Sequence, residues 1–245
     1  EMNTRLQVEH PVTELITGTD LVEWQLRAAA GQPLPQRQEQ LAIHGHAIEA
    51  RLYAEDAQRG FLPSTGTLAR LRLPSHGPHV RVDAGVEQGD VISPYYDPMI
   101  AKLIVWDTSR DAAIERMHQA LAQCQIAGVT TNARFLRQLV GTDSFRHARL
   151  DTALIEREQP ALSIGATPAP LYWALAAIAA AQAEAAPADP HDPYSPWRAV
   201  DGWRVLGPAA RTVLLAHLDA VQTLTVQPQP DGWRVQWNGN AVEVT

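Results

Sequence analysis

The sequence is poor in cysteine, in lysine and in aromatic residues. Its 245 residues include one cysteine, and aromatic residues make up 6%. A single cysteine excludes a disulfide framework and any zinc or iron–sulfur site built from several cysteines. Of the 20 lysines and arginines, Lys102 is the only lysine, so a mechanism that needs a lysine must use this residue or one outside the chain. The arginine bias indicates a GC-rich coding genome and favours a bacterial source.

The chain also lacks an excess of basic charge and a long hydrophobic run. Its formal net charge is −7, whereas a nucleic-acid-binding protein normally shows a basic footprint. The most apolar window, residues 171–186, is shorter than the about 20 residues of a membrane span and contains Gln182 and Glu184. We therefore expect neither nucleic acid nor a membrane as a partner, and we interpret this window as a buried, Ala-rich helix.

The composition nevertheless suffices for a folded core. Hydrophobic residues make up 45% and charged residues 19%, which excludes the disordered and fibrous classes. The length fits one large domain or two small ones. Prolines and a glycine interrupt regular structure after residue 158. We predict a first domain at residues 1–158, a linker at residues 159–170 and an incomplete second domain at residues 171–245.

Periodicity and capping signals predict the first elements. Polar and mostly apolar residues alternate over residues 1–9, which indicates a strand, and Pro11 ends it. A short helix is expected at residues 11–17. Asp20 and Glu23 form a capping box that opens the next helix.

Strands and turns are expected across residues 44–106, and two helices after them. The first of these helices begins near Ser109, with Thr108 and Asp111 as its capping box. The second covers residues 132–140.

The second half predicts a helix followed by an antiparallel β-region. Short alternating segments follow the Ala-rich helix, and Asp231-Gly232 and Asn238-Gly239 are hairpin turn signals between them. Three tryptophans in these segments, Trp203, Trp233 and Trp237, are expected to pack on the sheet.

The polar residues of the first segment follow an unusual order: acid, amide, guanidinium, amide, acid. Carboxylate and amide oxygens are hard ligands suited to Mg²⁺, so Glu1 and Asn3 could share one cation. Arg5 offers a bidentate fork for an oxyanion such as a carboxylate or bicarbonate. One small site can use the whole series, through Glu9, only if the chain bends near Gln7. The alternative interpretation is the solvated face of an amphipathic strand.

Three further residues or pairs are weaker candidates. His44 and His46 would share a strand face and could bind a metal, but no third ligand is evident, and core or edge histidines are the alternative. Lys102 lies in an apolar run and is expected to be packed or ion-paired. Cys124 falls on the buried stripe of the helix after Ser109, where a thiol is expected to be inert.

Several segments, in order and with similar spacing, resemble the catalytic region of biotin carboxylases, the ATP-grasp enzymes of biotin-dependent carboxylases. They are residues 1–14 (EMNTRLQVEHPVTE), 45–51 (GHAIEAR), 54–56 (AED), 61–66 (FLPSTG) and 94–103 (PYYDPMIAKL). The resemblance covers about residues 1–158. It implies an α+β fold, the C-terminal lobe of an ATP-grasp biotin carboxylase, in which helices flank an antiparallel sheet.

The resemblance also implies roles for the residues of the first segment. Glu1 and Asn3 correspond to ligands of Mg²⁺ or Mn²⁺, which accompanies ATP. Arg5 corresponds to a catalytic arginine that binds bicarbonate. Gln7 and the backbone of Val8 complete the bicarbonate pocket.

Three further roles follow from the same resemblance. Glu9 corresponds to the general base that deprotonates bicarbonate, and Arg51 to the arginine that holds bicarbonate and the ureido oxygen of biotin. Asp97 either orients Arg51 or is an ordinary turn residue. In the implied reaction, bicarbonate and ATP give carboxyphosphate, which supplies CO₂ to biotin N1′, and a guanidinium stabilises the enolate that forms on the ureido group.

The second half resembles the linker domain of acyl-CoA carboxylase α-subunits. Residues 192–198 (DPYSPWR) and 201–204 (DGWR) are most similar to those of methylcrotonyl-CoA carboxylase. This resemblance implies a helix and a partial antiparallel β-barrel that contact a carboxyltransferase β-subunit. Propionyl-CoA, acetyl-CoA and geranyl-CoA carboxylases remain alternatives, as does a non-catalytic module for subunit assembly.

By this resemblance the chain is expected to be a fragment that is inactive alone. The nucleotide-binding lid would precede Glu1, and the Met-Lys-Met that accepts biotin is absent. Biotin would therefore arrive on a separate carrier domain, and a homo-oligomer stays possible. The expected location is the cytoplasm in a bacterium, or the mitochondrial matrix in a eukaryote.

Overall fold

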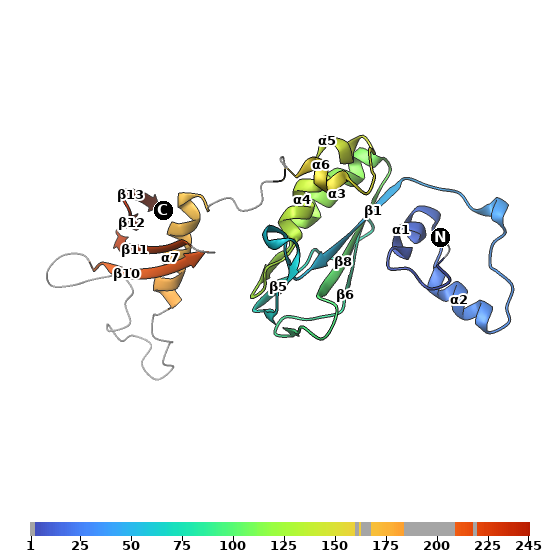
Figure 1. Cartoon of the computed structure of the whole chain (residues 1–245), viewed down its shortest axis with the longest axis horizontal. Coiled ribbons are helices and arrows are strands. Elements are labelled where there is room, and N and C mark those ends of the chain that lie inside the picture. The colour runs from blue at the N-terminus through green and yellow to red at the C-terminus, as the bar shows by residue number, and fades with distance from the viewer. Residues whose placement is uncertain (1–2, 160–161, 163–167, 184–208, 218–219) are drawn as a thin grey trace. The chain divides into compact units, whose positions relative to one another are not determined.

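The computed structural model describes residues 3–159, 162, 168–183, 209–217 and 220–245. The chain forms two compact units, Glu1–Gly165 and Ala166–Thr245 (Figure 1), and each has its own hydrophobic core. The predicted linker at residues 159–170 lies largely outside the described residues, so its limits stay a prediction.

The strand predicted at residues 1–9 is wrong for the described residues 3–9. The chain turns at residues 7–10, where the His10 amide donates to the Gln7 carbonyl at 3.2 Å, and helix α1 (His10–Thr17) begins there. No strand in the described part of the chain pairs with residues 3–9. A strand needs a neighbour to take its backbone hydrogen bonds, so alternation alone does not make one. The bend that a compact site requires near Gln7 is present.

The next two helices follow their sequence signals. Helix α1 ends at Gly18, whose φ of 67° is left-handed. Helix α2 (Leu21–Ala29) begins after Asp20, whose carboxylate accepts a hydrogen bond from the Glu23 amide at 2.8 Å. The predicted capping box thus supplies the helix N-terminus with an acceptor.

The main sheet of the first unit has three antiparallel strands in the order β1 (His46–Tyr53), β8 (Met99–Asp107) and β6 (Val80–Ala84). Along β1 the side chains alternate between buried and partly exposed, because successive residues of a strand point to opposite faces. The register places Arg51 opposite Lys102, and Lys102 opposite Asp83. One face of this sheet is apolar, and the other carries these charged groups.

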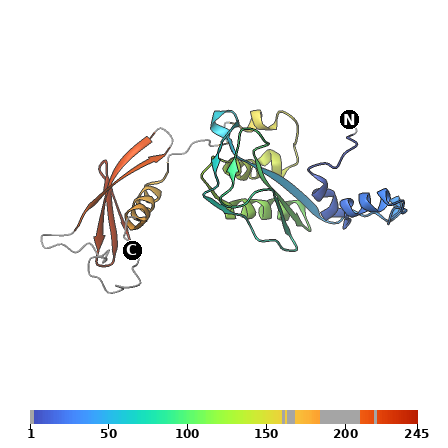
Figure 2. The ribbon, with the colours of Figure 1, turned by 90° about the horizontal axis from the view of Figure 1, so that it is seen from below.

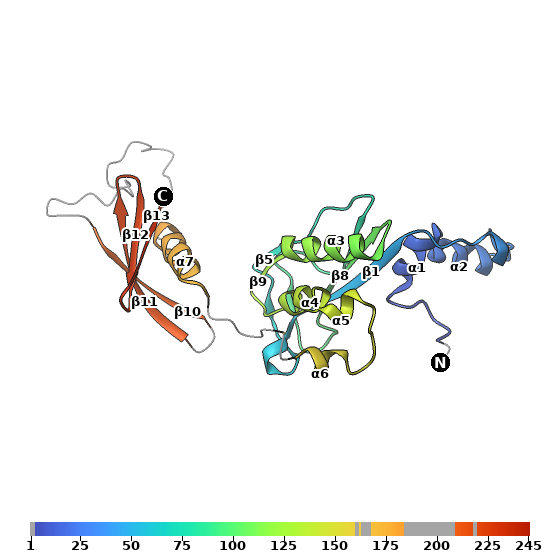
Figure 3. The ribbon, with the colours of Figure 1, turned by 90° about the horizontal axis from the view of Figure 1, so that it is seen from above.

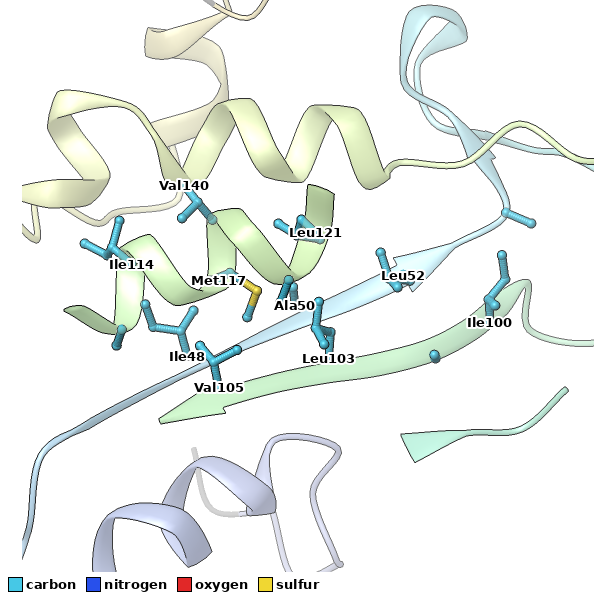
Figure 4. Packing of buried hydrophobic residues seen from close by; sticks show 14 of the residues in the cluster. Ile48, Ala50, Leu52, Ile100, Leu103, Val105, Ile114, Met117, Leu121 and Val140 are labelled. Carbon is cyan, nitrogen blue, oxygen red and sulfur yellow. The ribbon is translucent and has the colours of Figure 1, made fainter. Parts of the chain in front are cut away.

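The apolar face packs against two helices, α3 (Arg110–Gln123) and α4 (Ala133–Val140), as Figure 4 shows. Leu52, Leu103 and Met117 meet in this core and are at most 1% exposed. Truncating such a side chain to alanine typically costs about 2–5 kcal/mol. Helix α1 contacts β1 and β8, and its bonds to the charged side chains place it over the other face.

Helix α3 begins one residue later than its predicted capping box. Its N-cap is Ser109, whose hydroxyl accepts a hydrogen bond from the Ala112 amide at 3.3 Å. The Thr108 amide instead binds the carboxylate of Asp107 at 2.8 Å. Ser109 has the extended backbone that an N-cap requires, which is why it takes the role predicted for Thr108.

Short elements complete the first unit. Two-stranded antiparallel pairs form between β2 and β3, between β4 and β7, and between β5 and β9. The elements are β2 (Glu55–Asp56), η2 (Ala57–Arg59), β3 (Leu62–Pro63), β4 (Gly66–Thr67), β5 (Arg70–Arg72), β7 (Val91–Ile92), β9 (Gln125–Ala127), α5 (Asp143–Arg146) and α6 (Leu154–Glu158), with η1 (Gln38–Gln40) before β1.

Gly128, just after β9, is expected to tolerate no side chain. Its φ is +106°, and a Cβ there would lie 1.9 Å from the Thr67 carbonyl oxygen and 2.9 Å from the Ala69 amide nitrogen. Gly128→Ala should therefore destabilise the first unit by more than about 1 kcal/mol, since backbone strain and overlap add. The measurement is the thermal midpoint, with Gly85→Ala, which meets only open space, as control. An equal midpoint for the two variants would contradict the prediction.

In the second unit, helix α7 (Pro170–Ala183) packs on a four-stranded antiparallel sheet (Figures 2 and 3). Each strand pairs with the next one in the chain, and Asn238 and Gly239 form the last tight turn with positive φ. The expected helix and antiparallel β-region are confirmed. The strands are β10 (Arg211–His217), β11 (Ala220–Gln229), β12 (Gly232–Trp237) and β13 (Asn240–Val244).

The described strands of the second unit form an open sheet and not a closed barrel. Its core joins Trp173 and Ala177 of α7 to Leu224 and Val235. Trp233 and Trp237 pack on this sheet as predicted, whereas Trp203 and the segments at 192–198 and 201–204 lie outside the described residues. In the part of the chain that the structure describes, no helix is both long and apolar enough to cross a membrane.

Candidate active site

Lys102 joins the charged face of the main sheet to the segment before α1. Its Nζ donates to the Val8 carbonyl oxygen at 3.1 Å and pairs with Asp83 Oδ2 at 3.3 Å. Only 13% of the Lys102 side chain is exposed, so the prediction of a packed or ion-paired lysine is confirmed. Lys102 thereby fixes the backbone at Val8 over the sheet.

Arg81 makes the second link between the sheet and α1. Its Nε pairs with Asp83 Oδ1 at 2.9 Å, and its Nη1 pairs with Glu14 Oε2 at 2.8 Å. Burial raises the pKa of Asp83, but the hydrogen bonds and charges of Arg81 and Lys102 outweigh it and hold that pKa below its usual range. The other oxygen of Glu14 accepts a hydrogen bond from the Leu21 amide at 2.9 Å, so the same carboxylate also fixes the start of α2.

Arg51 lies between two carboxylates. Its Nη2 is 2.9 Å from Glu9 Oε2, and its Nε is 3.7 Å from Glu49 Oε1. Like charges directly opposite each other in a sheet are unfavourable, and Arg51 faces Lys102. The two acids beside Arg51 and Asp83 beside Lys102 offset that repulsion.

The two carboxylates differ in their access to solvent. The Glu9 side chain is 54% exposed, and the Glu49 side chain is 5% exposed. Both carboxylate oxygens of Glu49 are buried without a hydrogen-bond partner among the described residues. Burial raises the pKa of Glu49, and the charges of Lys102 and Arg51 oppose that rise.

A cleft of about 510 Å³ opens beside this ion pair. Three predicted site residues, Arg5, Gln7 and Glu9, line it together, and its apolar wall includes Leu21 and Trp24. A fourth predicted site residue, Arg51, is joined to this set by its ion pair with Glu9. The chain thus gathers two guanidinium groups, an amide and a carboxylate from segments 42 residues apart, a set suited to binding a small oxyanion and moving its proton.

Other predicted site residues are not placed in the cleft. Asn3 is exposed and does not line it, and Glu1 lies outside the described residues. The amide oxygen of Asn3 suits Mg²⁺ chemically, but one amide does not make a metal site. The Asp97 carboxylate accepts a hydrogen bond from the Met99 amide at 2.9 Å, within its own turn. Its orienting role toward Arg51 therefore stays a prediction.

The weaker candidates gain no functional support. Among the described residues, no group of three or more His, Cys, Asp or Glu side chains could hold a metal ion, so His44 and His46 find no further ligand. Burial raises the pKa of the Cys124 thiol to about 11, which keeps it protonated at neutral pH, as expected of an inert core thiol.

Two buried polar residues of this region had no role in the sequence interpretation. Asn132 bridges β1, because its amide donates to the Arg51 carbonyl at 3.1 Å and accepts from the Tyr53 amide at 3.0 Å. Glu49 stands two residues before Arg51 on the same strand face. The sequence could have indicated Glu49, because an acid two residues before Arg51 on an alternating strand lies on the same face. No sequence pattern indicated Asn132.

Three families match consecutive parts of the chain. Residues 1–37 match the carbamoyl-phosphate synthase L chain, ATP binding domain; residues 49–157 match the biotin carboxylase C-terminal domain; and residues 168–245 match the methylcrotonyl-CoA carboxylase, alpha-subunit, BT domain.

Similar whole proteins are longer than this chain. The methylcrotonoyl-CoA carboxylase subunit alpha, mitochondrial, of Oryza sativa subsp. japonica is 55% identical over 169 residues, which are 69% of this chain and 23% of that protein. The Arabidopsis thaliana protein of the same name is 52% identical over 162 residues, 66% of this chain and 22% of its own length. The chain therefore spans about a quarter of the length of these relatives.

Solved structures agree with these matches. The biotin carboxylase domain of Hydrogenobacter thermophilus 2-oxoglutarate carboxylase, in complex with MgADP, ADP and bicarbonate, superposes with a TM-score of 0.65 at 43% identity. The match covers 68% of this chain and 36% of that one.

The fold and the matches define a biotin carboxylase fragment of a biotin-dependent carboxylase, a class of ATP-dependent ligases. Its C-terminal unit is a BT domain of the methylcrotonyl-CoA carboxylase α-subunit type, and the relatives compared above are subunits of that enzyme.

Proposed function

We propose that the protein to which this chain belongs carboxylates biotin, held on a carrier domain, at the expense of ATP and bicarbonate. The observation that supports this most directly is the joint placement of Arg5, Gln7 and Glu9 in one cleft, with Arg51 ion-paired to Glu9. A solvated strand face would not bring residues 42 positions apart into one ion pair beside a cleft.

In this proposal the guanidinium of Arg5 binds bicarbonate, with Gln7 and the Val8 backbone beside it. Glu9 accepts the bicarbonate proton, which leaves the oxyanion free to attack the γ-phosphate of ATP. ADP departs, and the resulting carboxyphosphate breaks down into CO₂ and inorganic phosphate. The phosphate takes the proton of biotin N1′, and the deprotonated nitrogen bonds to the carbon of CO₂. Arg51 stabilises the negative charge that develops on the ureido oxygen of biotin, because a fixed cation there favours the charged species.

Glu1 and Asn3 are proposed to hold Mg²⁺ or Mn²⁺ together with the phosphates of ATP. Their oxygen atoms are the ligand type that these ions take, and phosphates normally supply the rest of the coordination. A metal held there would neutralise charge on the phosphates, while the residues of the cleft position bicarbonate.

The second unit is proposed to form a partial β-barrel that docks a carboxyltransferase β-subunit. The acyl substrate is proposed to be methylcrotonyl-CoA. The BT-domain match supports both statements. Propionyl-CoA, acetyl-CoA and geranyl-CoA carboxylases would use the same biotin carboxylase chemistry. The names of the rice and Arabidopsis relatives place those proteins in mitochondria; a cytoplasmic location for a bacterial source stays a prediction.

The full-length protein is expected to hydrolyse ATP in a bicarbonate-dependent reaction that free biotin stimulates. This chain alone should show none, because its match to the ATP binding family is confined to residues 1–37. The measurement is ADP release with and without bicarbonate. A full-length protein that forms its subunit assembly but lacks this activity would favour the assembly module over the enzyme.

A further inference from the structure

Glu49 is the one polar group of the described residues near the site whose burial the proposed chemistry leaves unexplained. Burying a carboxylate is costly unless it is paired and hydrogen-bonded. Both oxygens of Glu49 are nonetheless buried without a hydrogen-bond partner among the described residues, and its side chain is 5% exposed. A buried, unsatisfied group in a native fold requires a reason for its retention.

The reason lies in its position relative to Arg51. Glu49 Oε1 is 3.7 Å from Arg51 Nε, while Glu9 takes the neighbouring Nη2 at 2.9 Å. The exposed Glu9 side chain can rotate away from Arg51 when a substrate binds or when Glu9 is protonated. The buried Glu49 side chain is held in place by packing. Within the described part of the chain, the hydrogen bond from Arg51 to Glu9 uses Nη2 and none uses Nη1, so Nη1 is a donor that a ligand could take.

We propose that Glu49 is a positioning residue: a buried anion that holds the Nε side of the Arg51 guanidinium so that its Nη groups face Glu9 and the oxyanion substrates. This inference rests on the proposed function, because it assigns Arg51 the biotin and bicarbonate. Lys102 from β8, His10 from α1 and Glu9 are the other charged or titratable groups that act on Glu49. Burial is the largest influence and raises the pKa of Glu49, while the charges of Lys102 and Arg51 oppose that rise and favour its ionised form.

The test is Glu49→Gln in the full-length protein, which preserves shape and removes the charge. Positioning predicts that kcat of the bicarbonate-dependent ATPase falls at least tenfold, that KM for ATP changes less than twofold, and that the thermal midpoint stays equal or rises. A purely structural role predicts unchanged kcat. The matched control is Glu115→Gln on α3, whose carboxylate binds only Gln119 of its own helix among the described residues and which is expected to leave activity unchanged.

A second measurement separates this inference from the proposed function. In a crystal structure of the full-length wild type, Arg51 should take one orientation with its Nε toward Glu49. In a crystal structure of Glu49→Gln, Arg51 should be displaced. If the wild type lacks bicarbonate-dependent ATPase activity, the proposed function fails and the Arg51 orientation alone decides the inference. An unchanged Arg51 overturns the positioning role, as does a wild-type kcat. Should Glu49→Gln fail to fold, Glu49→Asp, which shortens the side chain but keeps its charge, is measured in the same two ways.

Discussion

Glu9→Gln in the full-length protein is expected to lower kcat of the bicarbonate-dependent ATPase by about 10²- to 10⁴-fold, the contribution typical of a positioned general base. The neutral amide can still accept a hydrogen bond from Arg51 Nη2, which lies 2.9 Å from the Glu9 carboxylate. It cannot take a proton from bicarbonate. The loss should therefore appear in kcat while the fold and ATP binding persist.

The control for this substitution is Glu115→Gln on α3, whose carboxylate binds only Gln119 of its own helix among the described residues. Arg5→Ala is the companion variant, because it should remove bicarbonate binding and leave Glu9 intact. Steady-state ADP release and thermal midpoints are measured for all three. A Glu9→Gln enzyme with turnover within twofold of the wild type would refute the assignment of the base.

Deleting residues 171–245 from the full-length α-subunit is expected to preserve biotin carboxylation and to reduce the co-purified carboxyltransferase subunit more than tenfold. The two hydrophobic cores share no residue, so removing the second leaves the first intact. The second unit also exposes large apolar side chains, including Tyr172 at 66% and Leu214 at 68%. Exposed apolar patches are typical of protein interfaces.

A point substitution sharpens this experiment. Leu214→Ser on β10 should weaken co-purification, whereas Leu150→Ser, at a 51% exposed position of the first unit, should not. The ratio of the two subunits after affinity purification is the measurement. Full stoichiometry in the truncated protein would show that the docking surface lies elsewhere.

Local signals in the sequence predicted local structure well. The Asp20 cap and the Asn238-Gly239 turn act through bonds or backbone conformations within a few residues, and the structure confirms each. The strand at residues 1–9 failed because strand formation depends on a pairing partner, which no local pattern specifies. The capping role predicted for Thr108 was wrong because the helix begins one residue later, where Ser109 has the extended backbone of an N-cap and accepts the hydrogen bond of the Ala112 amide.

The candidate site was predictable to the extent that one short segment carries it. Arg5, Gln7 and Glu9 follow each other in the chain and line the same cleft. Lys102, which holds this segment at Val8, and Asn132, which holds β1 at Arg51, both lie far away in the sequence. Their contacts depend on register across the sheet, which residue types alone do not reveal.

The alternation of β1 has an evolutionary consequence. Ile48, Ala50 and Leu52 point into the core, while Glu49 and Arg51 between them point to the charged face. A single inserted or deleted residue within this strand would exchange the two sets, burying a guanidinium under α3 and exposing the core residues. Substitutions can change either face independently, but both faces together fix the number of residues in β1. Related sequences should therefore differ in residue type along this strand and should not gain or lose a single residue within it.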